Sequence, residues 1–225
     1  MDNTFVTVVT AGWRTEGVKR VIDCLDKQTV QNFHHIIVND NNPDLRFWLK
    51  EQNYFHDSEM RHVIDFHQRT HFFGAFARNC GVMMAFSYFS ERIKTATDDF
   101  WIIFLDDDNL WEPNHLERFM EAHQAHPEAT MIGWDMEIRS TINPDYRHNV
   151  NCFIAPQQFD MGSFAIKHEL FDKYGYFMAG LGENKRKITY DALLYNKMAE
   201  GEGSDKVFVS HYRPCTFAFF SRDRK

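Results

Sequence analysis

The fold is decided by the stretch Phe100-Trp101-Ile102-Ile103-Phe104-Leu105, which runs directly into Asp106-Asp107-Asp108. An unbroken apolar run of this length indicates a strand buried on both faces, as in the centre of a parallel sheet. The acidic residues follow where the strand ends, and open α/β sheets bind ligands beyond the carboxyl ends of their strands. Because side chains alternate along a strand, we expect Asp106 and Asp108 on one face and Asp107 on the other.

Three adjacent carboxylates suggest a cation site. Their mutual repulsion costs free energy unless a positive charge lies between them, and oxygen ligands favour Mg²⁺ or Mn²⁺. A solvated acidic turn is the alternative interpretation. An EF-hand loop starting at Asp106 is excluded, because its fifth and sixth positions hold Leu110 and Trp111 where a ligand and a glycine are needed. A haloacid-dehalogenase-type phosphohydrolase that uses Asp106 and Asp108 remains an alternative enzyme.

The rest of the chain alternates between strand-like and helix-like segments, so the fold class is α/β. Before the apolar run, β-branched and apolar segments predict strands at 4–10, 34–39 and 61–66, and apolar spacing of three and four predicts helices at 15–29, 44–52 and 74–90. Beyond it, we expect helices at 112–126, 168–174 and 189–200, strands at 131–139, 158–166, 207–210 and 216–220, and a loop at 181–187. This order predicts a mostly parallel sheet with helices on both faces.

Composition narrows the classes of function. The net charge of −7 argues against nucleic acid or an anionic membrane as a partner. No apolar stretch approaches the ~20 residues of a membrane span, and we expect no signal peptide. The four cysteines are scattered without a Cys-x-x-Cys pair, which disfavours a disulfide framework or a structural zinc site. A cytoplasmic location is therefore expected.

Four motifs occur in an order typical of one enzyme family. They are Val6-Thr7-Val8-Val9-Thr10-Ala11, Ile36-Ile37-Val38-Asn39-Asp40, Arg78-Asn79-Cys80-Gly81 and Phe104-Leu105-Asp106-Asp107-Asp108-Asn109. Together they resemble the family 2 glycosyltransferases and the wider GT-A group, over roughly the first half of the chain. The resemblance implies a single GT-A domain over 1–225, a Rossmann-like sheet with a smaller mixed C-terminal part. Its halves would be nucleotide-binding (1–110) and acceptor-binding (111–225).

The resemblance also implies roles for single residues at the nucleotide. Asp40 would accept a hydrogen bond from the N–H of the base, which suits uracil, and Arg78 would reach the base or the diphosphate. Asp106 would contact the ribose and Asp108 would bind the metal, Mn²⁺ or Mg²⁺. A turn-forming Asp40 and a surface Arg78 are the alternatives. The complete expected nucleotide-binding set is Thr10, Ala11, Trp13, Asp40, Arg78, Asp106 and Asp107, with Trp13 as a core residue the alternative for that position.

Two residues of the second half complete the expected site. Asp191, in the first turn of the helix at 189–200, is the expected catalytic base that takes the proton of the acceptor hydroxyl. Glu183 is the alternative base, and a carboxylate favoured by the helix dipole is the alternative role for Asp191. His211 is similar to a late histidine that completes the metal shell in GT-A enzymes, and imidazole suits Mn²⁺ better than Mg²⁺; a structural histidine is the alternative.

Departures from the family pattern limit what the resemblance implies. The usual Pro-x-Tyr-Asn after the first strand is here Ala11-Gly12-Trp13-Arg14, and the usual Glu-Asp is Tyr190-Asp191. The Gln-x-x-Arg-Trp motif of processive synthases is missing, which disfavours a polymerising synthase. We expect transfer of one sugar from a UDP-sugar to a glycan, lipid-linked or protein-linked acceptor, with inversion. A retaining transferase and a nucleotide-sugar-binding module without activity remain alternatives.

Overall fold

A computed structural model describes residues 4–56, 60–70, 74–90, 99–140, 147–150, 161–177, 190–211 and 217–220. Within them a seven-stranded sheet has the order β3-β2-β1-β4-β8-β5-β9. Only β8 runs antiparallel to its neighbours in this sheet, so the predicted mostly parallel sheet is confirmed. The strands are β1 (Thr4–Gly12), β2 (His34–Asn39), β3 (Arg61–Asp65), β4 (Asp99–Phe104), β5 (Met131–Trp134), β8 (Phe164–Lys167) and β9 (Val207–Ser210).

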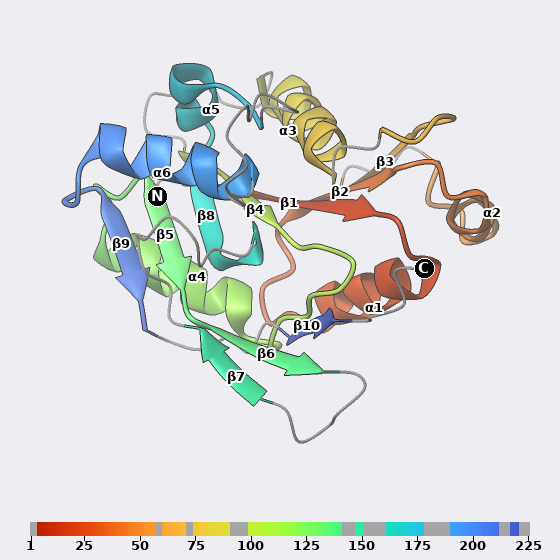
Figure 1. Ribbon diagram of the computed structural model, residues 1–225, viewed down its shortest axis with the longest axis horizontal. Helices are drawn as coiled ribbons and strands as arrows, with labels where there is room; N and C mark the ends of the chain where they lie inside the picture. The colour runs from red at the N-terminus through yellow and green to blue at the C-terminus, as the bar shows by residue number, and fades with distance from the viewer. Residues whose placement is uncertain are drawn as a thin grey trace, which may run out of the picture.

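The strand order reverses between β1 and β4. From β1 the chain proceeds outward to β2 and then to β3, and it returns to the other side of β1 for β4 (Figure 1). Such a reversal leaves a crevice outside the carboxyl ends of the two central strands, because the loops that follow them turn to opposite sides. The residues that follow Gly12 and Phe104 therefore border the crevice where ligands bind in folds of this kind.

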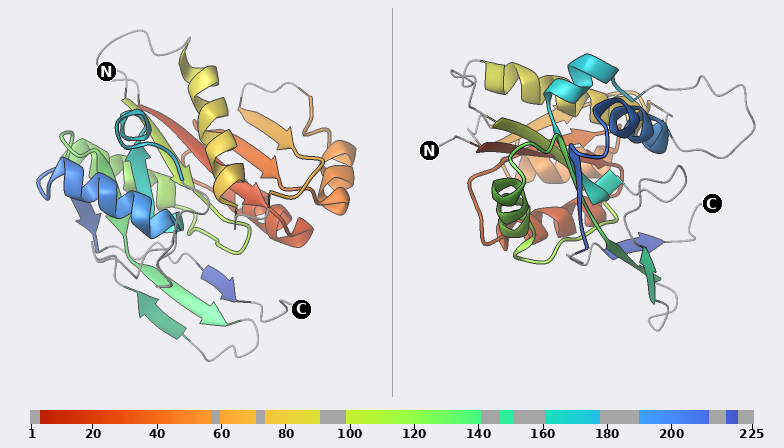
Figure 2. Two further views of the ribbon diagram at one scale, coloured as in Figure 1. Left: turned by 45° about the horizontal axis from the view of Figure 1, so that its top comes forward. Right: turned by 90° about the vertical axis from the view of Figure 1, so that its left-hand side faces the viewer.

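Helices cover both faces of the sheet. In Figure 2, right, α3, α5 and α6 lie on one side of the strands, and α1 and α4 lie on the other. The apolar run of β4 serves both layers: Phe100, Ile102 and Phe104 pack in the α3 layer, and Trp101, Ile103 and Leu105 pack in the α1 and α4 layer. The helices are α1 (Thr15–Asp26), α2 (Pro43–Glu51), α3 (Ala75–Ser90), α4 (His115–Ala125), α5 (Glu169–Tyr174) and α6 (Tyr190–Glu202).

The second half differs from the predicted strands in three places. The prediction of a single strand at 131–139 is wrong. Strand β5 ends at Trp134, and after Asp135 the chain continues as β6 (Met136–Ser140) in a second sheet. That sheet has the order β10-β6-β7, with β7 (Arg147–Val150) and β10 (Phe217–Phe220); β7 was not predicted. In the strand predicted at 158–166, residues Met161–Ser163 form a 3₁₀ turn, η1, and the strand begins at Phe164.

Local interactions set where helices begin. Asn42 caps α2 by accepting hydrogen bonds from the N–H groups of Asp44 and Leu45 at 3.0 and 3.2 Å. Thr15 is the first residue of α1, and the preceding Arg14 makes no side-chain cap. Among the described residues, no helix combines the length and the apolar character that a membrane crossing requires.

Candidate active site

Asp107 connects the end of β4 to the start of α1. Its buried carboxylate, 4% exposed, accepts hydrogen bonds from the backbone N–H groups of Trp13 at 2.8 Å and Arg14 at 2.6 Å. The Arg14 side chain donates to the other oxygen through Nε at 3.0 Å and also through Nη2. The middle aspartate thus fixes the loop between β1 and α1 by accepting from two backbone N–H groups that immediately precede the helix.

The approach of α1 to this aspartate depends on a glycine. A Cβ added at Gly17 would lie 2.1 Å from the backbone oxygen of Asp107. No side chain fits at that distance, so the first turn of α1 reaches the strand end only because position 17 carries no side chain. The two loops that border the crevice are therefore packed against each other backbone to backbone.

Asp106 turns to the other side and pairs with Arg78 of α3. The guanidinium donates from Nη2 to Oδ2 at 2.5 Å and from Nε to Oδ1 at 3.2 Å, and both side chains are largely buried. A two-point pair of this kind fixes orientation as well as charge. It forms because α3 lies close to β1, where a Cβ at Gly81 would meet Cγ1 of Val9 at 2.4 Å.

Asp108 is the most accessible carboxylate of the three. It is 33% exposed, against 18% for Asp106 and 4% for Asp107. Burial raises the pKa of Asp108, the negative charge of Asp106 raises it further, and Arg14 acts in the opposite direction. The Nη2 atom of Arg14 lies 2.8 Å from its Oδ2. Three carboxylates thus face two guanidinium groups, which leaves an excess of negative charge at Asp108.

The expected grouping of the aspartates needs correction. We expected Asp106 and Asp108 on one face, but the strand ends at Phe104 and the aspartates lie in the following turn. Asp107 and Asp108 share Arg14, whereas Asp106 pairs with Arg78. Strand alternation no longer applies once the backbone leaves the sheet.

The residues expected around the base lie at the ends of β1 and β2. The Asp40 carboxylate is buried and accepts from the backbone N–H of Thr70 at 2.9 Å and from its hydroxyl at 3.1 Å. The Trp13 ring is 44% exposed, and the Arg69 guanidinium lies 3.6 Å from the ring centroid. Trp13 is therefore a surface aromatic at the crevice rather than a core residue.

Thr10 and Ala11 differ in exposure. Thr10 is fully buried, and its hydroxyl lies 3.0 Å from Nε2 of His35. Ala11 is half-buried, and its Cβ would lie 3.5 Å from a Cβ added at Gly74, just before α3. Of the two residues, only Ala11 is therefore accessible to a ligand at this end of β1.

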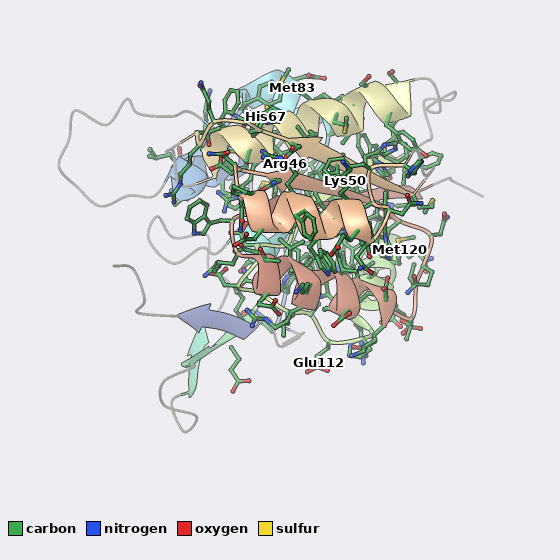
Figure 3. All side chains as sticks on the ribbon, turned by 90° about the vertical axis from the view of Figure 1, so that its right-hand side faces the viewer. Arg46, Lys50, His67, Met83, Glu112 and Met120 are labelled. Atoms are coloured by element: carbon green, nitrogen blue, oxygen red, sulfur yellow. The ribbon has the colours of Figure 1, made fainter. Side chains whose placement is uncertain are left out.

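Further side chains hold the loops of this edge in place. Asn42 donates to the carbonyl of Trp13 at 2.6 Å, which ties the β1 loop to the start of α2. Arg46, labelled in Figure 3 on α2, donates to Asp65 at 2.5 Å and to the carbonyl of Phe66 at 2.8 Å. The segment that carries Arg69 and Thr70 is thus anchored where it leaves β3.

His211 and Asp191 are the two expected site residues of the second half. His211 follows β9, is 73% exposed, and has its Nδ1 3.5 Å from the buried Asp135 carboxylate at the end of β5. Strand β8 is antiparallel to both β4 and β5, and β9 is parallel to β5, so β4, β5 and β9 run in the same direction. Asp135 and His211, which follow β5 and β9, therefore lie at the same sheet edge as the aspartates. Asp191 is the second residue of α6; its side chain, and the whole of Glu183 and the loop 181–187, lie outside the described residues.

The fit of a divalent cation can be judged from these contacts. Within the described part of the chain no three His, Cys, Asp or Glu side chains form a metal-binding group. Mg²⁺ and similar ions are nevertheless held by one or two carboxylates together with substrate phosphates. Asp108, partly desolvated and next to a second carboxylate, suits that arrangement. Nδ1 of His211, the other expected metal ligand, lies 3.5 Å from the Asp135 carboxylate.

Sequence reasoning missed three residues of this edge. Arg14, Arg69 and Thr70 each make a contact with a predicted site residue. Arg14 carried a signal, since it stands where the family pattern has asparagine. Arg69 and Thr70 had none, because their segment shows no periodicity and their partners are distant in the sequence.

Comparisons with known proteins give one family. The model of the family described as Glycosyl transferase family 2 matches residues 8–186. A comparison with curated proteins found no match. Among solved structures, S. aureus TarS 1–349 in complex with UDP is similar with a TM-score of 0.69 at 13% identity, over 98% of this chain and 61% of that chain.

A second solved structure gives the same picture. The mannosyltransferase PcManGT from Pyrobaculum calidifontis, in complex with GDP-Man and Mn²⁺, is similar with a TM-score of 0.65 at 14% identity, over 97% of this chain and 58% of that chain. The chain therefore spans less than two thirds of the length of either structure.

Proposed function

Because the chain belongs to glycosyl transferase family 2, we propose that it transfers a sugar from a nucleoside diphosphate donor to a hydroxyl group of an acceptor. The fold is GT-A, a mostly parallel sheet between helical layers. The observation that carries the proposal is the acidic turn at the strand-order reversal: Asp107 joins it to the β1 loop, and Asp108 stays accessible.

We propose a UDP-sugar as the donor. Trp13 is 44% exposed with Arg69 over its ring, and the exposed part of the ring offers an aromatic surface to the base. Each oxygen of Asp40 accepts one hydrogen bond from Thr70 and retains a lone pair for a base N–H. The two similar structures hold UDP and GDP-Man, so uracil and guanine are the bases to compare. The UDP assignment depends on Asp40 and on the expected family pattern.

Asp108 would hold the divalent cation, with the remaining positions left to donor phosphates and water. When bound, such an ion neutralises the diphosphate as it leaves. Arg78 keeps Asp106 in one orientation, so that its oxygens remain available at the crevice border. We keep His211 as a second candidate ligand.

Asp191 would take the proton of the acceptor hydroxyl in an inverting transfer, with Glu183 as the alternative base. A retaining transfer would use the same donor site. The acceptor, a glycan or a lipid-linked or protein-linked group, would bind to the half at 111–225. The phosphohydrolase alternative is disfavoured, because the family model that matches residues 8–186 is that of a glycosyl transferase family.

A thermal-shift panel tests the proposal. UDP, GDP and ADP are compared with and without Mn²⁺, for the native protein and Asp108→Ala. UDP with Mn²⁺ should raise the melting temperature most, because a ligand that binds only the folded state stabilises it by mass action. Asp108→Ala should lose most of the metal-dependent part. A shift with GDP but not with UDP would move the base assignment to guanine. Absence of a shift with every nucleotide would contradict a donor site here.

A further inference from the structure

Arg14 contacts two of the three aspartates at once. Its Nε and Nη2 atoms donate to Oδ1 of Asp107, and the same Nη2 lies 2.8 Å from Oδ2 of Asp108. One guanidinium therefore pairs with a buried carboxylate and an accessible one, and its single positive charge offsets only one of their two negative charges. The backbone of this arginine is held as well, because its N–H donates a hydrogen bond to Oδ2 of Asp107 at 2.6 Å.

The two halves of this contact differ in how easily they can be broken. Asp107 is 4% exposed and accepts four donors from Trp13 and Arg14, so that contact is built into the loop. Asp108 receives a single end-on contact from Nη2 and is 33% exposed. A tilt of the whole planar guanidinium about its Nε hydrogen bond would break the contact with Asp108 and retain Nε on Asp107.

The bond to Asp108 stands where a cation would act. A guanidinium 2.8 Å from Oδ2 uses a lone pair of that oxygen. Its full positive charge also repels a second cation at short range, and the partial burial of Asp108 weakens solvent screening of that repulsion. A divalent ion bound to this carboxylate would lie close to the Arg14 guanidinium, so the repulsion between the two positive charges opposes its binding.

We propose that Arg14 is a built-in counter-ion that competes with the divalent cation for Asp108. The inference rests on the proposed donor site and adds a residue that tunes it. Without a donor, Arg14 holds Asp108 and the cation binds weakly. When a nucleoside diphosphate arrives with the cation, the guanidinium leaves Asp108, stays tethered to Asp107, and meets the negative phosphates. Cation and nucleotide binding are thereby made cooperative.

The test measures direct binding of Mn²⁺ with and without UDP. The electron paramagnetic resonance signal of the free ion reports how much Mn²⁺ remains unbound. Arg14→Met removes the charge and keeps the apolar stem. It should bind Mn²⁺ without nucleotide about tenfold more tightly than the native protein. UDP should strengthen Mn²⁺ binding more in the native protein than in Arg14→Met, because the variant has no competing contact to release.

Matched variants separate competition from a general change of charge. Arg69→Met removes a positive charge that lies over the Trp13 ring instead of on a carboxylate, and its affinity for Mn²⁺ in the absence of nucleotide should change by less than about twofold. Asp108→Asn should bind almost no Mn²⁺. Arg14→Lys keeps a positive charge on a shorter side chain, so its Mn²⁺ affinity should fall between those of the native protein and Arg14→Met. It replaces Arg14→Met if that variant does not fold.

The outcomes distinguish this inference from the proposed function. Equal or weaker Mn²⁺ binding by Arg14→Met, in a folded protein whose Asp108→Asn variant loses binding, overturns the competition and leaves the donor site standing. An equal gain in Arg69→Met also overturns it. Absence of Mn²⁺ binding in the native protein and in Arg14→Met, even with UDP, contradicts both proposals.

Discussion

At the scale of single residues, the neighbours of each aspartate decide what it can do. Asp107 is enclosed by backbone N–H groups and is a structural link, and Asp106 is held by Arg78 from the opposite helical layer. Asp108 meets only one end of Arg14 and is partly open to solvent. Identical side chains at consecutive positions therefore have three different surroundings, and the proposed metal-binding role falls to the carboxylate with the fewest protein donors.

Replacing Asp191 with Asn tests the proposed base. The amide cannot accept the proton of the acceptor hydroxyl, so kcat for sugar transfer should fall about 10²–10⁴-fold with KM for the donor nearly unchanged. Steady-state kinetics with the UDP-sugar donor measure both constants. Glu200→Gln makes the same change of charge at an exposed position of the same helix and should leave turnover unaltered. Native turnover in Asp191→Asn would transfer the role to Glu183.

At the scale of elements, the start of α1 depends on the missing side chain at position 17. Helix propensity alone predicts that Gly17→Ala stabilises the protein by up to about 1 kcal/mol. The contact argues the reverse, because the new Cβ would lie 2.1 Å from the Asp107 carbonyl oxygen. Backbone must move to relieve that overlap, so we expect destabilisation by about 1–3 kcal/mol, measured by urea unfolding, together with weaker nucleotide binding.

Asp23→Ala is the control for this change, since it puts alanine on the exposed face of the same helix. It should alter the free energy of unfolding by less than about 0.5 kcal/mol. A Gly17→Ala protein as stable as the native one, with unchanged nucleotide affinity, would mean that α1 does not need its close contact with the strand end.

The elements of the first half could be predicted because their apolar patterns are long and agree with their surroundings. The strand at 34–39 and its parallel partners match the prediction within two residues. The break between β5 and β6 at Asp135 could not be predicted, because a polar residue between apolar ones is also typical of a continuous strand. Its carboxylate is buried against His211, a contact that periodicity cannot reveal. The short polar stretch of β7 gives no strand signal at all.

At the scale of the whole molecule, two buried histidines make the fold sensitive to acid. Burial lowers the pKa of His35 to about 3, with smaller contributions from the charges of Arg61 and His34, and burial alone lowers the pKa of His115 to about 3. In the unfolded chain both titrate near 6.5. The unfolded state therefore binds protons first as pH falls, so stability is complete above pH 6.5 and declines between 6.5 and 3.

Between pH 7 and pH 5 each of these histidines should cost about 2 kcal/mol of unfolding free energy. Urea denaturation at the two pH values measures the loss. The His115 ring packs between Trp111 and Trp134, with centroids 4.4 and 4.3 Å away, so His115→Phe keeps an aromatic ring without a titrating group. It should remove about half of the histidine-dependent loss. The same pH dependence in the variant would contradict a neutral, buried His115.

The site could be predicted from the sequence only in part. The motif order placed the aspartates, Asp40, Arg78 and Trp13 at one sheet edge, because parallel strands bring their carboxyl ends together. The pairing within that edge could not be predicted: Arg14 meets Asp107 across 93 residues, and Thr70 meets Asp40 across 30. Such contacts depend on how loops from different strands settle against each other, and a single sequence does not encode them as a local pattern.

The central claim is that the acidic turn after β4 and the loop after β1 form one donor site. A crystal structure of the protein grown with UDP and Mn²⁺ tests it most directly. We expect the uracil against Trp13, the diphosphate beside the turn, and an ion bound to the Asp108 carboxylate. Nucleotide bound away from this edge, or an ion-free Asp108 still held by Arg14 with UDP present, would contradict the account.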